Sequence, residues 1–180
     1  MKMAASDSEI INAVLEGDSH SFGELVDRYQ ARLMRYLTNL LGNHHDSEEI
    51  VQDSFVQAFR HLNAFDSSKS CFEAWLTTIA RRKAFNYKQK KRPSTIAQMN
   101  ETTDYAPNNQ AMEGWREELD AALARLPILQ RSAFTLTEIQ QMPYEQVSKI
   151  EGVPIGTIKS RVSRAKEKLR NILEKPTRNK

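Results

Sequence analysis

The sequence predicts an all-α protein built from two small helical domains that are joined by a flexible linker. Apolar residues recur at spacings of three and four along almost the whole chain, which is the period of an amphipathic helix. No run of alternating β-branched residues is bounded by turn dipeptides, so strands are not expected. Residues 93–112 lack a helical period, contain Pro93 and Pro107, and are rich in Ser, Thr, Asn and Gln, which predicts the linker.

Four helices are predicted in the first domain, which comprises residues 1–92. The second of them starts after Asp18 and ends at Gly42, because Asp is a favoured N-cap and Gly ends helices. The fourth ends at Arg92, because Pro93 cannot continue a helix. The four predicted spans are 8–16, 19–41, 46–62 and 70–92.

The second domain, residues 113–175, is also predicted to be helical and is followed by a basic tail at 176–180. Short helical bundles need most of their Leu, Ile and Phe residues for packing, so these residues require no functional explanation. The four predicted spans are 113–125, 128–140, 144–151 and 155–173.

The composition limits the kinds of protein that this chain can form. Hydrophobic residues make up 39% of the 180, below the usual share of about 45 to 50%, so a modest, split core is expected and a large single-core enzyme is disfavoured. The one cysteine, Cys71, can form neither an internal disulfide nor a cysteine-rich zinc site. No segment approaches the roughly 20 apolar residues that span a bilayer, so we expect a cytoplasmic protein without membrane insertion.

Positive charge is concentrated in two blocks, although the net charge is only +3. Residues 81–92 and 155–180 together hold 16 of the 26 basic residues, and the rest of the chain is strongly acidic. Two basic blocks on an acidic chain suggest a polyanion that is bound at two places. The alternative is that both blocks are solvated helix faces with a frayed tail.

One side of the predicted helix at 46–62 combines acidic and apolar residues. On a helical wheel the core side holds Val51, Phe55, Ala58, Phe59 and Leu62, and the opposite side holds Asp46, Glu49, Ile50, Asp53, Val56, Gln57 and Arg60. A solvated face has no need of Ile50 and Val56 among carboxylates, so this side is interpreted as a protein-binding surface. The alternative is that Asp46, Glu48 and Glu49 only complement the helix dipole.

The predicted helix at 70–92 carries a basic face that includes an aromatic ring. We expect Phe72, Trp75, Leu76 and Ile79 in the core, and Arg81, Arg82, Phe85, Lys88 and Arg92 on the outer face. Cations pair with phosphates and rings stack on unpaired bases, so this face suits single-stranded nucleic acid. The alternative is that Phe85 packs under a neighbouring helix.

The segment from Tyr144 onward has the pattern of a helix-turn-helix. Gly152 is placed to make the turn, the small Ser148 lies where two helices approach closely, and the second helix has a buried seam of Ile158, Val162, Ala165 and Leu169. Its exposed stripe holds Thr157, Arg161, Arg164 and Lys168, with Ser160 beside it and Lys159 at the flank. Such a helix fits the major groove of DNA, whereas the alternative is a helical hairpin without a DNA role.

These motifs, in this order, resemble the small two-domain bacterial sigma factors of the extracytoplasmic function (ECF) class, within the sigma-70 family. DSEEIVQDSFVQAFRHLNAFD resembles the helix that binds the clamp helices of the RNA polymerase β′ subunit. FEAWLTTIA resembles the start of the promoter-melting helix, and GTIKSR is similar to the family's recognition-helix signature. The resemblance covers nearly the whole chain except the linker and the tail.

The resemblance implies a role for each domain. The first would bind core RNA polymerase, through its β′ clamp helices and its β subunit, and melt the −10 element; the second would read the −35 element. An anti-sigma factor is the implied regulatory partner, and it would hold the protein in the cytoplasm or at the membrane. The core-binding residues would be Asp46, Glu48, Glu49, Ile50, Asp53, Val56 and Gln57.

Two DNA surfaces follow from the same resemblance. The family's loop at residues 63–70 encloses a flipped base, and here Phe65 and Lys69 supply suitable parts, although the loop could also only connect helices. The −10 set is Phe65, Lys69, Arg81, Arg82, Phe85 and Lys88, and the −35 set is Thr157, Lys159, Ser160, Arg161, Arg164 and Lys168. The family usually has Asn and Asp at positions that hold Arg82 and Asn86 here, so this face is more basic than usual.

No part of the sequence points to covalent chemistry. His44, His45 and Asp46 are adjacent on a predicted turn and lack the spacing of a metal site, and no nucleophile and base are paired, so neither a cofactor nor catalysis is expected. The competing interpretation is a helix-turn-helix transcriptional regulator that forms no holoenzyme. It accounts for the second domain only.

Overall fold

The computed structural model describes residues 5–91 and 113–174, and every regular element in these two ranges is helical. The N-terminal half (5–91) contains α1 (Asp7–Leu15), η1 (Ser19–Ser21), α2 (Phe22–Leu41), α3 (His44–Arg60), η2 (Leu62–Ala64) and α4 (Phe72–Lys91). The C-terminal half (113–174) contains α5 (Glu113–Ala124), α6 (Ile128–Phe134), the π-helical turn η3 (Thr135–Ile139), α7 (Tyr144–Glu151) and α8 (Ile155–Leu173). The all-α prediction is confirmed. The predicted linker, Arg92 and the basic tail lie outside the described residues.

Local capping explains where the first helices begin and end. Ser6 and Glu9 form a reciprocal capping box at the start of α1. Gly42 ends α2 in the left-handed conformation at φ 74°, as its position predicts. Asn43 caps α3 through the amide of Asp46, so α3 starts at His44. The prediction of a turn at residues 44–46 is therefore wrong, because the cap at Asn43 places these residues in the first turn of α3.

The predicted helix at 128–140 is two elements in the structure. After Phe134 the chain widens into the π-helical turn, in which the amide of Gln140 donates to the carbonyl of Thr135 at 2.9 Å. Gln141 then adopts φ 56°, which ends the helix. The extra residue in this π-helical turn rotates Gln140 toward α2. There the side-chain amide of Gln140 donates to the carbonyl of Arg32 at 2.8 Å.

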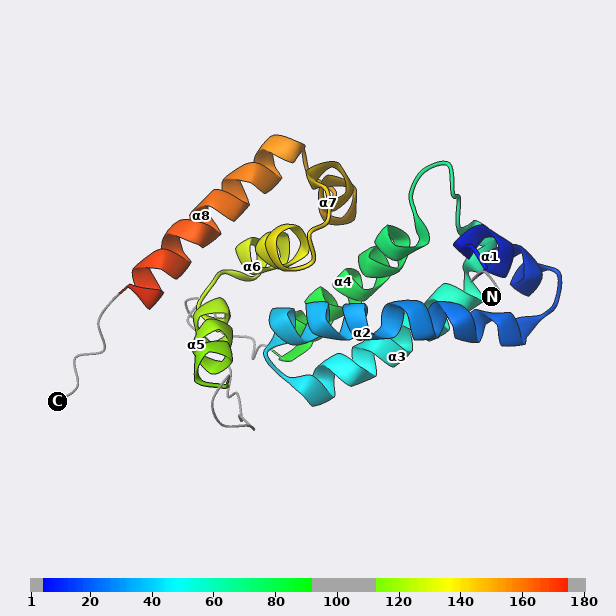
Figure 1. Cartoon of the computed structure of the whole chain (residues 1–180), viewed down its shortest axis with the longest axis horizontal. Helices are drawn as coiled ribbons and strands as arrows, with labels where there is room; N and C mark the ends of the chain where they lie inside the picture. Colours follow the sequence, from blue (N-terminus) through cyan, green and yellow to red (C-terminus); the bar gives the residue numbers. More distant parts are fainter. Residues whose placement is uncertain (1–4, 92–112, 175–180) are drawn as a thin grey trace.

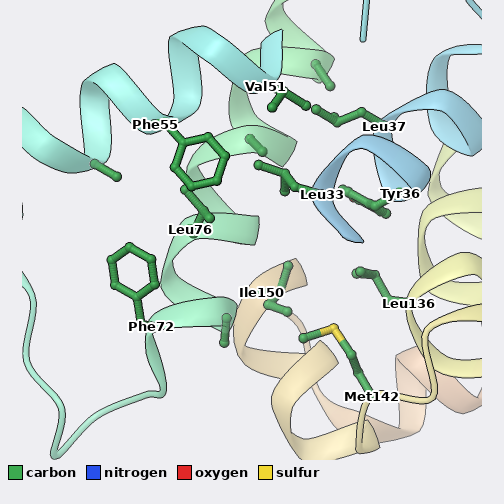
Figure 2. Packing of buried hydrophobic residues seen from close by; sticks show 14 of the residues in the cluster. Leu33, Tyr36, Leu37, Val51, Phe55, Phe72, Leu76, Leu136, Met142 and Ile150 are labelled. Carbon is green, nitrogen blue, oxygen red and sulfur yellow. The ribbon is translucent and has the colours of Figure 1, made fainter. Parts of the chain in front are cut away.

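The two halves pack against each other, as Figure 1 shows. One large core contains Leu33 and Tyr36 of α2, Leu136 of η3, Ile150 of α7, and Met142, which lies between η3 and α7 (Figure 2). A smaller second cluster joins α5 to α8. The core is thus divided, as its modest apolar fraction predicts, but the division does not follow the predicted linker.

None of the described helices is long and apolar enough to cross a membrane.

Candidate functional site

The outer face of α3 presents an acidic rim around an exposed apolar side chain. Val56 is 48% exposed, and the carboxylates of Glu48 and Glu49 face solvent near it. Asp53 is also exposed and forms an ion pair with Lys83 of α4 at 3.2 Å. Asp46 is half-buried at the first turn, and Gln57 is exposed. Of the predicted core-binding residues, all except Ile50 are therefore at least partly exposed on the predicted protein-binding surface.

Two residues of α3 lie on the side opposite to the one predicted. Ile50 is only 5% exposed and belongs to the core, so its placement on the protein-binding surface is wrong. Phe59 is 42% exposed, and its ring packs edge-on against Phe22 at 5.1 Å between centroids.

Two buried serines explain this rotation of the buried face. Ser47 and Ser54 lie at the centre of the buried arc, and their hydroxyls donate to the carbonyls four residues earlier, each at 2.6 Å. Because these bonds satisfy the hydroxyls, the serines tolerate burial. A helical wheel counts Ser as polar and so places the buried arc too far toward Phe59.

The loop between η2 and α4 is held by its own side chains. Asp66 accepts hydrogen bonds from Ser68 and pairs with Lys69 at 2.9 Å, and the Ser68 bonds, followed by Lys69, hold the pKa of Asp66 at about 2. Phe65 is half-buried, with its ring centroid 5.8 Å from Phe72 and 5.4 Å from Trp75. The Lys69 side chain is 80% exposed, whereas the Phe65 ring already packs against two neighbours.

The basic face of α4 is only partly exposed. Arg82 faces solvent and Lys88 is half-buried. Phe85 packs against the large core, and the Arg81 guanidinium lies over its ring at 4.3 Å from the centroid. The prediction that Phe85 and Arg81 both lie on the outer face is wrong, because both are half-buried and α7 contacts α4. The packing alternative describes Phe85 better.

A groove of about 340 Å³ lies where the loop, α4 and α7 meet. Lys69 of the loop and Trp75 and Arg82 of α4 line one side of the groove, and Lys149 and Ile150 of α7 line the other. The Nζ of Lys149 donates to the carbonyl of Lys69 at 2.9 Å. Trp75 packs against the core, as predicted, but it is only half-buried and its remaining surface lines this groove. The sequence gave Lys149 no role, since only the tertiary fold brings α7 beside this loop.

Helices α7 and α8 form the predicted helix-turn-helix. Gly152 takes the left-handed conformation at φ 66°, and the hydroxyl of Ser148 donates to the carbonyl of Val153 across the turn at 2.6 Å. The seam of Ile158, Val162, Ala165 and Leu169 is buried as predicted. Of the predicted DNA stripe, Thr157 is half-buried, and exposed positions are held by Lys159, Ser160, Arg164 and Lys168.

Arg161 departs from the exposed stripe because Glu151 holds it. Glu151, the last residue of α7, has a side chain with 0% exposure, and its Oε2 accepts from Nη1 of Arg161 at 2.8 Å. The Arg161 side chain is only 17% exposed. Sequence reasoning missed Glu151. Its spacing of four from Val147 was the available signal, because that spacing places it on the buried face of α7.

The same carboxylate joins the two halves of the chain. Arg81 of α4 forms a two-point contact with Glu151, Nε to Oε1 and Nη2 to Oε2, each at 2.8 Å, and its side chain is only 14% exposed. The hydroxyl of Ser132 donates to Oε1 at 2.5 Å, so the hydroxyl of Tyr36 donates to Ser132 at 2.8 Å. Burial, and after it the Glu151 charge, raises the pKa of Tyr36 and keeps that phenol protonated.

Two family models match most of the chain. Residues 25–93 match sigma-70 region 2, and residues 116–169 match sigma-70 region 4. From here on the N-terminal half is called region 2 and the C-terminal half region 4.

Curated relatives match over nearly their whole length. The ECF RNA polymerase sigma-E factor of Haemophilus influenzae is 31% identical over 183 residues, which cover 94% of this chain and 96% of the relative. The ECF RNA polymerase sigma factor SigW of Bacillus subtilis is 27% identical, with 91% of this chain and 94% of the relative covered.

Solved structures share the arrangement of the helices. The sigma factor RpoE of Bartonella quintana, in a complex with the anti-sigma factor NepR, superposes with a TM-score of 0.73 at 28% identity, over 86% of this chain and 98% of that one. CnrH, in a complex with the cytosolic domain of CnrY, has the same fold with a TM-score of 0.72 at 24% identity, over 93% of this chain and 97% of that one.

Proposed function

This chain belongs to the ECF class of RNA polymerase sigma factors. We propose that α3 binds core polymerase and that α4 and α8 contact promoter DNA. The outer face of α3 binds core polymerase through the β′ clamp helices. The loop at 63–70 and the basic face of α4 contact the −10 element, and α8 contacts the −35 element. The sections of the chain that perform these tasks are region 2 within residues 1–92 and region 4 within 113–175.

The α3 surface supports the polymerase contact by its mixture of charge and apolar area. Val56 gives an apolar centre, and Glu48, Glu49 and Asp53 surround it with negative charge. An apolar centre with a charged rim is the usual composition of a protein interface, and the charge orients a basic partner. Ile50 does not contact the partner; it packs in the core and anchors α3 there.

The exposed stripe of α8 supports DNA reading in the major groove. Lys159 and Ser160 lie near the start of the helix, where side chains of a recognition helix reach base edges. Arg164 and Lys168 lie one and two turns later, where they suit phosphate contacts. Thr157 at the first turn completes this surface, and Arg161 joins it once its guanidinium is released from Glu151.

The groove between the loop and α4 supports the contact with the opened −10 strand. Lys69 and Arg82 are exposed cations beside the indole of Trp75. Charge that follows a backbone, together with a ring on which bases stack, is the pattern of single-strand binding. Trp75 therefore takes the stacking role that the sequence assigns to Phe65 and Phe85, while Arg81 and Lys88 add charge along α4.

An anti-sigma factor is the proposed regulator. RpoE of Bartonella quintana, 28% identical to this chain, was solved with such a factor. We place the protein in the cytoplasm, where an anti-sigma factor anchored in the membrane could also retain it.

The observation that carries this proposal is the presence of both surfaces on one chain, the acidic-apolar face of α3 and the basic stripe of α8. A helix-turn-helix regulator without a holoenzyme needs only the second. The test combines the purified protein with core polymerase and selects active promoters from a random library. Co-elution with core polymerase and an enriched pair of elements support the proposal, and duplex binding without co-elution contradicts it.

The −10 assignment has its own test. Residues 63–70 are exchanged for the corresponding loop of SigW of Bacillus subtilis, and initiation is measured on promoters that differ only in the −10 element. A changed −10 preference with unchanged −35 use supports the assignment. An unchanged preference in a chimera that still binds polymerase contradicts it.

A further inference from the structure

The groove between the loop at 63–70, α4 and α7 is positively charged. Because α7 packs against α4 (Figure 1), cations from both regions line it, Lys69 and Arg82 from region 2 and Lys149 from region 4. None of the residues that line the groove is acidic. Clefts lined by one sign of charge concentrate ions of the opposite sign, so this groove attracts anions.

Within the residues that the structure describes, two of these cations have no carboxylate partner. Arg82 is exposed and forms no ion pair with any of them. The Nζ of Lys149 donates to the carbonyl of Lys69 at 2.9 Å, which holds the ammonium group in place without neutralising its charge. Lys69 itself is paired with Asp66 at 2.9 Å. An anionic ligand can therefore neutralise two positive charges in the groove.

The indole of Trp75 gives the groove an aromatic wall. Its ring centroid lies 5.4 Å from that of Phe65 and 5.8 Å from that of Phe72, and these contacts hold the indole in place. Trp75 is half-buried, and part of its remaining surface lines the groove. Ile79 of α4 and Ile150 of α7 add apolar area. A flat aromatic ligand can stack on such a side chain.

The size and charge of the groove suit one nucleotide. Its volume of about 340 Å³ lies near the lower end of the range of about 300 to 1,000 Å³ for small-molecule sites. Arginine binds phosphate through its planar fork and lysine binds it as a point charge. A terminal phosphate carries about −1.5 to −2 charge, and each further phosphate adds to it. A di- or triphosphate therefore matches three cations better than a monophosphate does.

We propose that this groove binds a nucleoside di- or triphosphate, with the base against Trp75 and the phosphates on Arg82 and Lys149. The site needs both regions, because α7 supplies Lys149 and Ile150. It shares Trp75 and Arg82 with the proposed −10 surface, so a bound nucleotide and the −10 strand compete there. This competition rests on the proposed function of α4, whereas nucleotide binding does not.

Tryptophan fluorescence tests the site directly. The chain has two tryptophans, and Trp115 is 69% exposed on α5 outside the groove, so Trp115→Phe leaves Trp75 as the reporter. Titration with ATP or GTP should quench Trp75 saturably, with a dissociation constant below about 1 mM. Inorganic triphosphate, measured by competition with ATP, should bind at least about tenfold more weakly because it has no base to stack.

Two outcomes of this titration overturn the proposal. The first is the absence of saturable quenching by either nucleotide. The second is equal affinity for inorganic triphosphate and ATP, which would show only a general attraction of anions to the groove.

Two substitutions that remove charge locate the phosphates. In the Trp115→Phe background, Arg82→Gln and Lys149→Gln should each weaken ATP binding about tenfold. Arg60→Gln and Lys90→Gln are the matched controls, since each replaces an exposed cation that does not line the groove. Both controls should leave the affinity unchanged. Equal losses in all four variants, or no loss in Lys149→Gln, would contradict the proposal.

The same variants separate the nucleotide site from the proposed function. In complex with core polymerase, Lys149→Gln should initiate normally, because Lys149 lies outside the proposed DNA surfaces, whereas Arg82→Gln should initiate several-fold less on promoters that depend on the −10 element. Normal initiation by Arg82→Gln with weakened ATP binding would count against the −10 assignment and support a separate nucleotide site. Equal losses of initiation in both variants would assign the whole groove to DNA and overturn the proposal.

Discussion

The outer face of α3 and the basic face of α4 differ in what covers them, although both belong to region 2. On α3, the charged residues Glu48 and Glu49 face solvent. On α4, the guanidinium of Arg81 is enclosed against Glu151 of region 4. The surface proposed for a protein partner is thus exposed, and the surface proposed for nucleic acid is partly covered by the chain itself.

On the proposed assignments, the polymerase surface on α3 is accessible in this arrangement, whereas the Arg81 guanidinium on α4 is enclosed against Glu151. The outer faces of α3 and α4 therefore differ in solvent exposure because different helices pack beside them. Four experiments test how far this comparison holds.

The largest effect on partner binding is expected from charge reversal on the exposed surface of α3. Glu49→Lys with Asp53→Lys should lower the affinity for core polymerase about 100-fold, because like charges then face a basic partner. Circular dichroism should show unchanged helicity, since both residues are exposed. Affinity is measured by competition with a labelled sigma factor.

The matched control for this reversal is Glu24→Lys with Asp27→Lys, which makes the same change of charge on exposed positions of α2. It should leave polymerase affinity unchanged. Equal losses in the two double variants would remove α3 from the interface and leave only a general effect of charge.

The next effect separates anchoring from contact on α3. Ile50→Ala should lower the free energy of unfolding by about 2 to 5 kcal/mol, because Ile50 is buried. Val56→Ala should change it by less than about 0.5 kcal/mol while weakening polymerase binding, because Val56 is exposed. Denaturant unfolding and the polymerase competition assay distinguish the two. A stable Ile50→Ala variant would contradict the packing described for α3.

A smaller effect is expected at the recognition helix. Arg161→Ala should cost about 1 to 3 kcal/mol in promoter binding if Arg161 reads a base edge after its release from Glu151, and should relax the preference at one −35 position. A phosphate contact would weaken all promoters equally. A panel of promoters that vary only in the −35 element tells these apart, and no change on any of them would exclude Arg161 from the DNA surface.

The smallest effect concerns the hydrogen bond behind Glu151. Tyr36→Phe removes the hydroxyl that donates to Ser132 and should cost about 1 kcal/mol of stability. Ser132 still donates to Glu151 in this variant, so the ion pairs of Glu151 should persist, and denaturant unfolding measures the loss. An unchanged free energy of unfolding would show that the Tyr36 hydroxyl does not stabilise this contact.

The sequence by itself determined the helices, the turn at Gly152 and the two charged blocks. These features depend on local rules, because periodicity, capping and the backbone freedom of glycine act within a few residues. The helix at 155–173 and its buried seam were predictable for this reason, as was the end of α2 at Gly42. The exposed carboxylates of α3 were predictable as well.

Only the tertiary structure decided which side chains remain available. Ile50 is buried and Phe59 exposed because the hydrogen-bonded Ser47 and Ser54 shift the buried arc of α3. Arg81 and Arg161 are enclosed because α7 brings one carboxylate between α4 and α8. Contacts between residues 70 positions apart depend on how whole helices pack, and no local pattern in the sequence contains that information.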